Sequence, residues 1–261
     1  IRLGFDHLMV RPNQMISQHL SRRFFVERGN PKIHWDAGVA ALPVQVAVNY
    51  GIPLVFYAEH GPSEYGGHVL SEENRKIQDH TEVLENQIGD HPENWVDDVV
   101  VEADLASYIL PDIEKVNEIG VTALYFGYFF KWSMLENYQY LNDKMDFLVD
   151  PEGRTQGTFT YFDSLDDKID TLYYHMQFIK FGFGRATRDA CRMIQNQQMT
   201  REEGLAKARE FDDEFPSRFF HESLEYLNLG ESEFFDIVDS HRNPEIWKPK
   251  GNDFELINKL K

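Results

Sequence analysis

The run Ile52–Ala58, with the sequence IPLVFYA, is continuously apolar and has the length of one strand. A strand without polar alternation is typical of a parallel sheet that helices cover on both faces, because neither face meets water. A segment with helical spacing, residues 36–50, comes before it. Residues 111–118 and 121–128 repeat the order of helix and apolar strand. These units predict an α/β fold with a parallel sheet.

The sequence around these units predicts two regions. Residues 4–10 have the pattern of a short buried strand, residues 14–27 that of a helix, and residues 71–104 are polar and acidic, as in an insertion or lid. Beyond Gly157 we expect helices at residues 165–180, 186–195, 200–211, 217–227 and 231–241. We therefore predict an α/β domain at residues 1–156 and an α-helical subdomain at residues 157–261.

The amino-acid composition excludes several classes of protein. The 26 Lys and Arg residues against 44 Asp and Glu residues give a formal net charge of −18, and such a surface repels the phosphates of nucleic acids and of anionic lipids. No stretch approaches the roughly 18 consecutive apolar residues of a membrane-spanning helix. A single cysteine, Cys191, excludes an internal disulfide framework and fits a reducing compartment. We expect a cytoplasmic protein that neither binds nucleic acid nor inserts into a membrane.

The loop that follows the apolar strand is the first candidate for a binding site, because ligands of open α/β sheets bind beyond the carboxyl ends of the strands. This loop supplies Glu59, His60, Gly61, Glu64, Tyr65, Gly66 and Gly67. Its glutamates are candidate acid/base groups or magnesium ligands, and its glycines permit close approach of the backbone to a substrate. An ordinary polar loop is the alternative interpretation.

Two polar residues stand at the start of the helix at residues 36–50. His34 is a candidate substrate-binding group, and Asp36 is in position to cap the helix. Capping alone explains Asp36, and a single histidine is more often a structural group than a catalyst.

Two features near residue 180 are further candidates. The polar residues Asp166, Asp170, Tyr173, Gln177 and Lys180 recur on one face of the expected helix at 165–180, as in the wall of a cleft or in a solvated face. In Phe181–Thr187, glycines alternate with aromatic residues before a helix, so that free helix amides and Arg185 would hold an anion. Alternatively, Gly182 and Gly184 simply end one helix and begin the next.

Capping signals mark two of the expected helix starts. Ser164 is the expected cap of the helix at 165–180. Thr200 and Glu203 form the pattern of a capping box, in which the hydroxyl and the carboxylate each accept a hydrogen bond from a free amide of the first turn.

Several motifs occur together and in order along the chain. They are residues 43–48 and 52–54, Glu59–Gly61, Glu64–Gly67, Ser164–Asp170, Lys180–Thr187, Thr200–Gly204 and Phe235–Asp239. In this order they resemble the N-acetyl sugar amidotransferases of surface-polysaccharide biosynthesis, which serve lipopolysaccharide O-antigens or flagellin glycans. A match of many motifs over most of the chain is more specific than any single glycine pattern.

The resemblance implies both a fold and a reaction. The fold would be an adenine-nucleotide alpha hydrolase-like domain of the N-type ATP pyrophosphatase (PP-loop) class at residues 1–156, with the helical subdomain at 157–261 contributing to the active-site cleft. The cofactors would be ATP and magnesium. Ammonia would convert the N-acetyl group of a nucleotide-linked sugar to an acetamidino group. The partners would be a glutaminase and a cyclase-like subunit resembling those of histidine biosynthesis.

The chain also departs from the pattern of that family. The pyrophosphate-binding Ser-Gly-Gly-x-Asp-Ser loop does not occur in it. The resemblance therefore implies a PP-loop domain that is incomplete at its N-terminus, in a chain that alone does not complete the ATP chemistry. Some relatives carry a cysteine pair near residues 32–35, and its absence here argues against a protein-bound metal at that point.

The resemblance suggests roles for the candidate residues. Lys180 and Arg185 would neutralise phosphate or adenylate charge, and Asp166 and Asp167 would handle magnesium or ammonia. The sugar would be bound by His34 and by the loop residues Glu59, His60, Gly61, Glu64, Tyr65, Gly66 and Gly67. Two other functions stay open: a non-catalytic scaffold that docks the glutaminase and cyclase-like pair, and a sugar-nucleotide enzyme that works without ATP.

Overall fold

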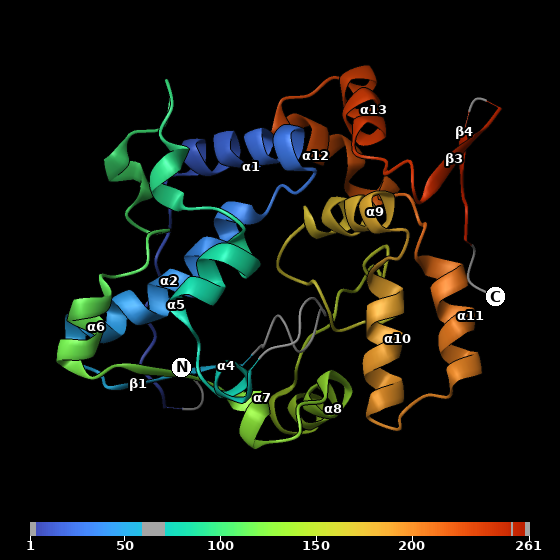
Figure 1. The fold of residues 1–261 in the computed structure, drawn as a ribbon. Helices are drawn as coiled ribbons and strands as arrows, with labels where there is room; N and C mark the ends of the chain where they lie inside the picture. Colours follow the sequence, from blue (N-terminus) through green and yellow to red (C-terminus); the bar gives the residue numbers. More distant parts are fainter. Residues whose placement is uncertain (1–3, 59–70, 252, 259–261) are drawn as a thin grey trace.

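The computed structural model describes residues 4–58, 71–251 and 253–258. Figure 1 shows the elements of the N-terminal half on one side and those of the C-terminal part on the other. The N-terminal half contains α1 (Gln14–Arg28), α2 (Ile33–Tyr50), β1 (Leu54–Tyr57), α4 (Glu72–Lys76), α5 (His80–Glu82), η1 (Val83–Ile88), η2 (Pro92–Trp95), η3 (Glu102–Leu105), α6 (Ile113–Ile119), β2 (Thr122–Tyr125), α7 (Phe126–Phe129) and α8 (Met134–Met145). The C-terminal part contains α9 (Asp170–Phe181), α10 (Arg185–Gln195), α11 (Arg201–Phe211), η4 (Ser217–Phe219), α12 (Phe220–Leu227), α13 (Glu231–Ser240), β3 (Trp247–Lys250) and β4 (Asp253–Leu256).

The predicted helix and strand units form a small parallel sheet. β1 pairs with β2 in parallel, from Leu54 opposite Thr122 to Tyr57 opposite Tyr125. The hydroxyl of Tyr57 donates a hydrogen bond to the carbonyl oxygen of Ala40 (2.7 Å) and so ties β1 to α2. The described residues are thus a mixed helical fold with a small parallel sheet, compatible with the α/β class.

The expected burial of the first strand on both faces is wrong for the described residues. Leu54 and Phe56 are 47% and 52% exposed. Phe126 and Phe129 of α7 contact the Phe56 ring edge-on, with centroids 6.1 and 6.4 Å apart, but leave it half exposed. The strand therefore has a covered face toward α2 and an open aromatic face.

Residues 4–10 do not form the predicted strand. They lie in irregular backbone, and Phe5 and Met9 are 75% and 69% exposed. No strand of the described chain pairs with this segment, so neither ladder hydrogen bonds nor a buried face hold it in a sheet.

Local signals set the ends of the helices. Gly51 and Gly120 adopt left-handed conformations, with φ of 64° and 75°, and cap α2 and α6. Asn13 accepts a hydrogen bond from the backbone amide of Met15 and begins α1. The buried face of α2 consists largely of small residues: Ala37, Gly38, Ala40, Ala41, Val44 and Ala47. These side chains let neighbouring elements approach α2 closely.

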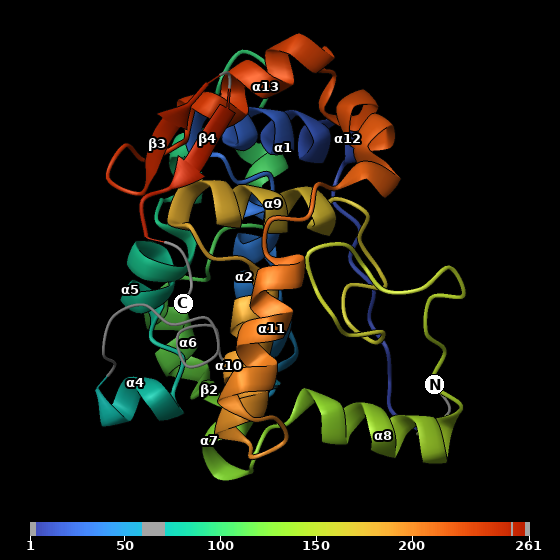
Figure 2. The same ribbon diagram turned by 90° about the vertical axis from the view of Figure 1, so that its right-hand side faces the viewer.

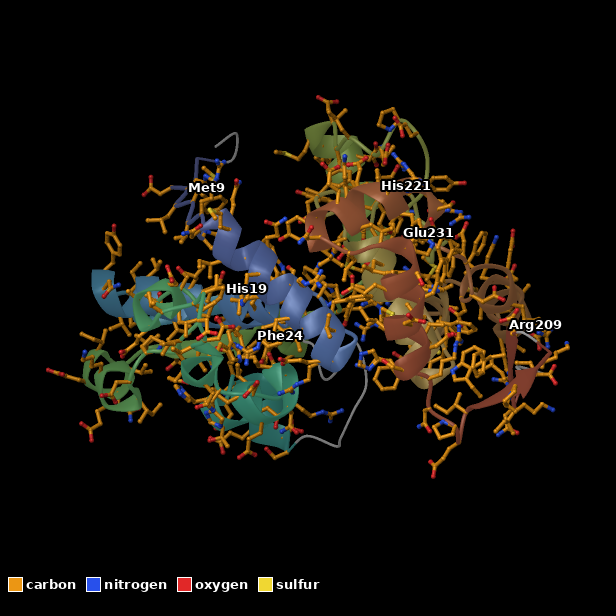
Figure 3. The ribbon with its side chains drawn as sticks, turned by 90° about the horizontal axis from the view of Figure 1, so that it is seen from above. Met9, His19, Phe24, Arg209, His221 and Glu231 are labelled. Atoms are coloured by element: carbon orange, nitrogen blue, oxygen red, sulfur yellow. The ribbon has the colours of Figure 1, made fainter. Side chains whose placement is uncertain are left out.

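Two clusters of buried apolar side chains form the core. The first joins α1 and α2 to the segment 83–110, and includes Leu20, Phe24, Val83, Trp95, Val100 and Leu105. The second joins α9, α12 and α13, and it also contains Phe25 of α1. Seen from above, α1 lies between the N-terminal elements and helices α12 and α13 (Figure 3). The segment expected as a polar insertion thus contributes Val83, Ile88, Trp95 and Val100 to the first cluster.

The helices of the C-terminal part were mostly expected, and α10 and α11 lie side by side (Figure 1). The capping box of Thr200 and Glu203 is present at the start of α11. The predicted start of α9 is wrong: the helix begins at Asp170, and Ser164 does not cap it. Ser164 has a φ of 53° and its hydroxyl bonds the hydroxyl of Tyr174 instead, which holds residues 157–169 as a loop against α9.

The last two described elements, β3 and β4, form a hairpin that was not predicted from the sequence. β3 and β4 are antiparallel, and they lie beside the end of α9 in Figure 2. The indole nitrogen of Trp247 donates a hydrogen bond to the carbonyl oxygen of Ile179 (2.6 Å) and fixes the hairpin to α9. Among the described helices, none combines the length and hydrophobicity needed to cross a membrane.

Candidate functional site

A cavity of about 440 Å³ lies where the two parts of the chain meet. α1 and α2 form one wall, and the loop before α9 together with α12 forms the other. We call it the Lys32 cavity. It is lined by Ser17, Ser21, Pro31, Lys32, His34, Trp35, Asp166, Asp167, Lys168, Ile169, Glu222, Ser223 and Tyr226. Three residues expected from the sequence, His34, Asp166 and Asp167, therefore meet in one place.

Lys32 connects this cavity to the polar interior. Its ammonium forms ion pairs with the carboxylates of Asp167 (3.1 Å) and Asp170, and its side chain is only 14% exposed. Burial by itself would lower the pKa of the Lys32 amine, but attraction by Asp170 and Asp167 outweighs it and raises that pKa. Lys32 thus stays charged, and its charge is neutralised within the protein.

His34 is buried in the cavity wall, with 4% of its surface exposed. Its Nε2 shares a hydrogen bond of 2.8 Å with the hydroxyl of Ser17, whereas its Nδ1 has no hydrogen-bond partner among the described residues. Burial and then the charge of Lys32 lower the pKa of His34 to about 4. The imidazole is therefore neutral at neutral pH, and one of its nitrogens is unsatisfied.

A buried ionic network lies behind the cavity and is centred on Arg185. The guanidinium donates hydrogen bonds to Asp189 (2.8 Å, from Nε) and to the hydroxyl of Tyr174 (2.6 Å), and it lies 3.5 Å from the carboxylate of Asp163. The Tyr174 hydroxyl in turn lies 3.5 Å from Asp170, which pairs with Lys32. The network thus reaches from α10 to the start of α2.

The pKa values of two carboxylates of this network are shifted in opposite directions. Burial opposes ionisation of Asp189, but Arg185 and Arg188 outweigh it and hold the pKa of that carboxyl below its usual value. Burial raises the pKa of Asp163, and attraction by Arg185 does not fully compensate for it. Each carboxylate also accepts a hydrogen bond from a hydroxyl: Thr158 donates to Asp189 (2.8 Å), and Thr160 donates to Asp163 (2.7 Å).

The turn before α10 does not offer an open anion site. Gly182 ends α9 in a left-handed conformation, with φ of 73°, and Gly184 begins α10, as the structural alternative proposed. The carboxylate of Asp212 accepts hydrogen bonds from the backbone amide of Thr187 (2.8 Å) and from its hydroxyl (2.5 Å). A carboxylate of the chain itself thus lies at this helix N-terminus.

Lys180 and Arg185 do not line the Lys32 cavity. The ammonium of Lys180 donates a hydrogen bond to the carbonyl oxygen of Arg28 (2.7 Å), and burial and then the charge of Arg28 lower its pKa. Arg185 is engaged in the buried network. Glu59, His60, Gly61, Glu64, Tyr65, Gly66 and Gly67 lie outside the described residues. Among the described residues, no group of three or more His, Cys, Asp or Glu side chains is arranged to hold a metal ion.

Sequence reasoning missed several residues of the site. Ser17 and Lys32 carried no signal, because their partners are distant in the sequence. Asp189 did carry one, since it lies four residues after Arg185 on the same helix and opposite charges at that spacing face each other. The Tyr174 hydroxyl was missed because the pattern placed it on neither the apolar nor the polar face of α9.

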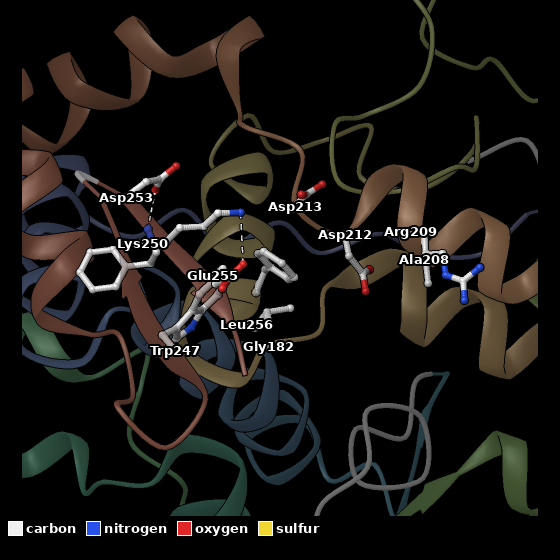
Figure 4. A pocket seen from close by; sticks show the side chains of 12 residues that line it. Gly182, Ala208, Arg209, Asp212, Asp213, Trp247, Lys250, Asp253, Glu255 and Leu256 are labelled. Carbon is white, nitrogen blue, oxygen red and sulfur yellow. Dashed lines mark hydrogen bonds and ion pairs between the residues drawn. The ribbon is translucent and has the colours of Figure 1, made fainter. Parts of the chain in front are cut away.

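A second cavity, of about 600 Å³, lies between the β3–β4 hairpin, α9 and α11 (Figure 4). It is lined by Phe178, Gly182, Ala208, Arg209, Asp212, Asp213, Trp247, Lys250, Asp253, Phe254, Glu255 and Leu256. Lys250 forms an ion pair with Glu255 (3.2 Å) across the hairpin. Of the residues proposed from the sequence as catalytic or substrate-binding, none of those that the structure describes lines this cavity.

Comparison with known families finds a match for the C-terminal part of the chain. Residues 156–261 match the model described as LPS biosynthesis protein WbpG-like, C-terminal domain. A search of curated proteins found no match. The matched region contains Asp166, Asp167, Lys180 and Arg185, and so covers one wall of the Lys32 cavity and most of the buried network. Residues 156–261 are therefore similar to the C-terminal domain of WbpG-like LPS biosynthesis proteins.

Proposed function

We propose that this chain is the synthetase part of an ATP-dependent amidotransferase in surface-polysaccharide biosynthesis. The enzyme replaces the oxygen of an N-acetyl group on a nucleotide-linked sugar by nitrogen from ammonia, which a glutaminase partner supplies. One observation carries the proposal: the segment that matches a polysaccharide-biosynthesis family places Asp166 and Asp167 opposite Lys32 and His34 in one polar cavity. The motif resemblance to N-acetyl sugar amidotransferases supports the finer assignment.

The described residues do not fit the phosphates of ATP. Arg185 is bound by Asp189, Asp163 and Tyr174, Lys180 is bound by a backbone carbonyl, and the N-terminus of α10 meets Asp212. We therefore derive no step through ATP from these residues. In this proposal Arg185 is a positioning residue, because it holds the Tyr174 hydroxyl and the loop before α9 in place.

In this proposal the described residues act on the sugar and on the ammonia that adds to it, and not on ATP. A neutral ammonia molecule that adds to an amide carbon must give up protons as the amidine forms, and a nearby carboxylate accepts a proton readily. Asp166 lines the cavity and has no hydrogen-bond or ion-pair partner among the described residues. His34 is a poor base, since its pKa is about 4, but as a neutral imidazole it is suited to orient the substrate.

The test is conversion of the sugar by the full-length protein. A nucleotide-linked N-acetyl sugar is incubated with ATP and ammonia, or with ATP, glutamine and the glutaminase partner. Mass spectrometry of the sugar should show one oxygen replaced by one NH unit, only when ATP and the nitrogen source are both present. An unchanged sugar mass alongside an active glutaminase would contradict the proposal.

A second candidate function is supported by the same observation, that basic side chains near α10 are bound to other groups of the protein. Since the described basic groups near α10 are bound within the protein, the chain would also suit a non-catalytic subunit that docks a glutaminase and cyclase-like pair. The two functions differ in one measurement. Asp166→Asn abolishes amidine formation by the complex if the chain is the enzyme, and leaves it unchanged if the chain is only a scaffold.

A further inference from the structure

We propose that the cavity between the β3–β4 hairpin, α9 and α11 binds a small organic cation, which carries an ammonium or guanidinium group on an aliphatic chain. We call it the hairpin cavity. Its volume of about 600 Å³ falls in the range of roughly 300–1,000 Å³ usual for small-molecule sites. The proposal does not depend on the amidotransferase reaction, because the hairpin cavity and the Lys32 cavity have no lining residue in common. Four features lead to this ligand: an excess of carboxylates, a buried carboxylate, two helix ends and aromatic rings.

The lining of the hairpin cavity has an excess of negative charge. Its charged residues are four acidic and two basic ones: Asp212, Asp213, Asp253, Glu255, Arg209 and Lys250. The ammonium of Lys250 is paired with Glu255 (3.2 Å). The guanidinium of Arg209 points away from the hairpin (Figure 4). Asp213 follows α11 and Asp253 begins β4, so they lie on opposite walls, and neither forms an ion pair with a described residue. Both carboxylates are therefore available to a cationic ligand.

Asp212 is a buried carboxylate with which no cation of the described chain is paired. It is only 5% exposed, and the groups that donate hydrogen bonds to it, the amide and the hydroxyl of Thr187, are uncharged. Burial raises the pKa of Asp212, and repulsion by Asp213 adds to the rise, although these hydrogen bonds oppose it. A buried carboxylate without a counter-charge is unfavourable. A cation in the cavity that Asp212 lines would supply that counter-charge.

Two helices end at the hairpin cavity. Gly182 directly follows the last residue of α9, Asp212 directly follows that of α11, and both line the cavity. The C-terminal end of a helix carries a partial negative charge and favours a nearby cation. The N-terminus of α10 has the opposite partial charge, but neither Gly184 nor Thr187 at this end lines the cavity. The helix ends therefore favour the same sign of ligand charge as the carboxylates do.

Aromatic rings form much of the apolar lining. Phe178, Trp247 and Phe254 contribute them, and the rings of Phe178 and Trp247 meet edge-on with centroids 5.4 Å apart. An aromatic ring attracts an ammonium or guanidinium group over its face. The guanidinium of Arg242 already binds in this way, 4.9 Å from the ring centroid of Trp247 and 4.7 Å from that of Phe254. Arg242 does not line the cavity, so these two rings present another part of their surface to it.

Two other kinds of ligand fit this lining less well. An anion would meet an excess of carboxylates, which repel it. A metal ion in a protein takes several oxygen ligands at once, and no three or more His, Cys, Asp or Glu side chains of the described residues are arranged to hold one. An aliphatic chain that ends in an ammonium or guanidinium group contacts both the carboxylates and the rings. Agmatine and spermidine are compounds of this class.

Saturation-transfer NMR on the full-length protein tests the proposal. The probes are agmatine, spermidine and butylguanidine, and butylurea is the uncharged compound with the same shape as butylguanidine. The solution contains about 0.15 M salt, which screens surface charges beyond about 8 Å and so reduces general attraction to the acidic protein. We expect saturable transfer to the cations and none to butylurea. Absence of saturable transfer to all three cations, or equal transfer to butylurea and butylguanidine, would overturn the proposal.

Variants locate the binding. Asp213→Asn and Asp253→Asn each remove one carboxylate from one wall of the hairpin cavity and should each weaken binding roughly 3-fold, and together roughly 10-fold. Asp98→Asn is the matched control, because it makes the same change at an exposed carboxylate of the N-terminal half, and it should leave the Kd unchanged. All three positions are exposed, and melting curves check that the variants fold. Wild-type binding by the double variant, or an equal loss in Asp98→Asn, would show that the cations do not bind in this cavity.

Discussion

Asp212 and Thr187 are joined by two hydrogen bonds, in which the backbone amide and the hydroxyl of Thr187 donate to the two carboxylate oxygens of Asp212 at 2.8 and 2.5 Å. Asp212 is the residue that ends α11, and Thr187 is in the first turn of α10. A helix N-terminus attracts negative charge, and here the charge comes from the neighbouring helix. An external anion would have to displace a buried carboxylate, which is why we assign no phosphate to this turn.

The first prediction concerns this contact. Asp212→Asn keeps the shape of the side chain but replaces one of the two oxygens that accept from Thr187 by an NH2 group, which cannot accept, so the free energy of unfolding should fall by about 1 kcal/mol. Urea unfolding at neutral pH measures it. Asp213→Asn, the same change at the exposed neighbour, should stay within about 0.5 kcal/mol of the wild type. Equal losses in the two variants would show that the contact has no special weight.

The second prediction concerns Gly184. A Cβ atom there would lie 2.8 Å from the carbonyl oxygen of Asp212 and 3.0 Å from its Cα atom, both of which are backbone. Gly184→Ala should therefore separate α10 from α11 and cost about 2 kcal/mol of unfolding free energy. Gly230→Ala is the control at another helix N-cap, since a Cβ atom at Gly230 meets nothing within 4 Å. Its cost should be about 0.5 kcal/mol, from the poorer N-cap alone, and an equally mild Gly184→Ala would refute the close packing.

The third prediction concerns Arg185. Lysine keeps the positive charge but cannot hold Asp189, Asp163 and Tyr174 at once, because it lacks the planar fork of donors. We expect Arg185→Lys to lower the unfolding free energy by about 2 kcal/mol. Arg209→Lys, at an exposed position of α11, should change it by less than about 0.5 kcal/mol. Thermal and urea unfolding of both variants check this, and a fully stable Arg185→Lys protein with impaired turnover would favour direct contact with substrate instead.

The fourth prediction concerns the pH dependence of stability. Burial lowers the pKa of both His34 and His175 to about 4 from an ordinary value of 6.5, with a smaller contribution from Lys32 and from Arg242, respectively. Above pH 6.5 the folded and unfolded states are both neutral at these residues. Between 6.5 and 4 only the unfolded state takes up their protons, so stability should fall as the pH falls through this window.

Single variants isolate each histidine. His175→Gln should flatten the dependence by up to one proton, or about 1.4 kcal/mol per pH unit, and His34→Gln should do the same. Urea unfolding at several pH values measures the slopes. Parallel curves for the wild type and both variants would show that these imidazoles are protonated in the folded protein.

Much of the fold was predictable because its signals are local. Gly51 and Gly120 end helices through their own backbone conformation, and the capping box of Thr200 and Glu203 involves four consecutive residues. The hairpin was also signalled, by Gly251-Asn252 between two short extended runs, which is a two-residue turn sequence. It was missed because the flanking runs contain charged residues and Pro249, and so lack the usual alternation.

The candidate site was predictable only in part. The motifs identified Asp166 and Asp167, and the start of a helix identified His34, but nothing local indicated that they share a cavity. Their meeting depends on Lys32 and Asp170, which are 138 residues apart and are brought together by packing of α1 against α12. Burial of Arg185 depends likewise on the loop before α9, of which residues 165–169 were predicted to be helical.

The position of α1 determines how this protein can be divided or recombined. Phe25 belongs to the core of the C-terminal part, and Lys32 neutralises carboxylates of that part, although both precede residue 156. A fragment cut at the family boundary would thus expose an apolar gap and leave Asp167 and Asp170 without their counter-charge. An exchange of C-terminal domains between relatives should accordingly carry residues 14–35 along with the graft.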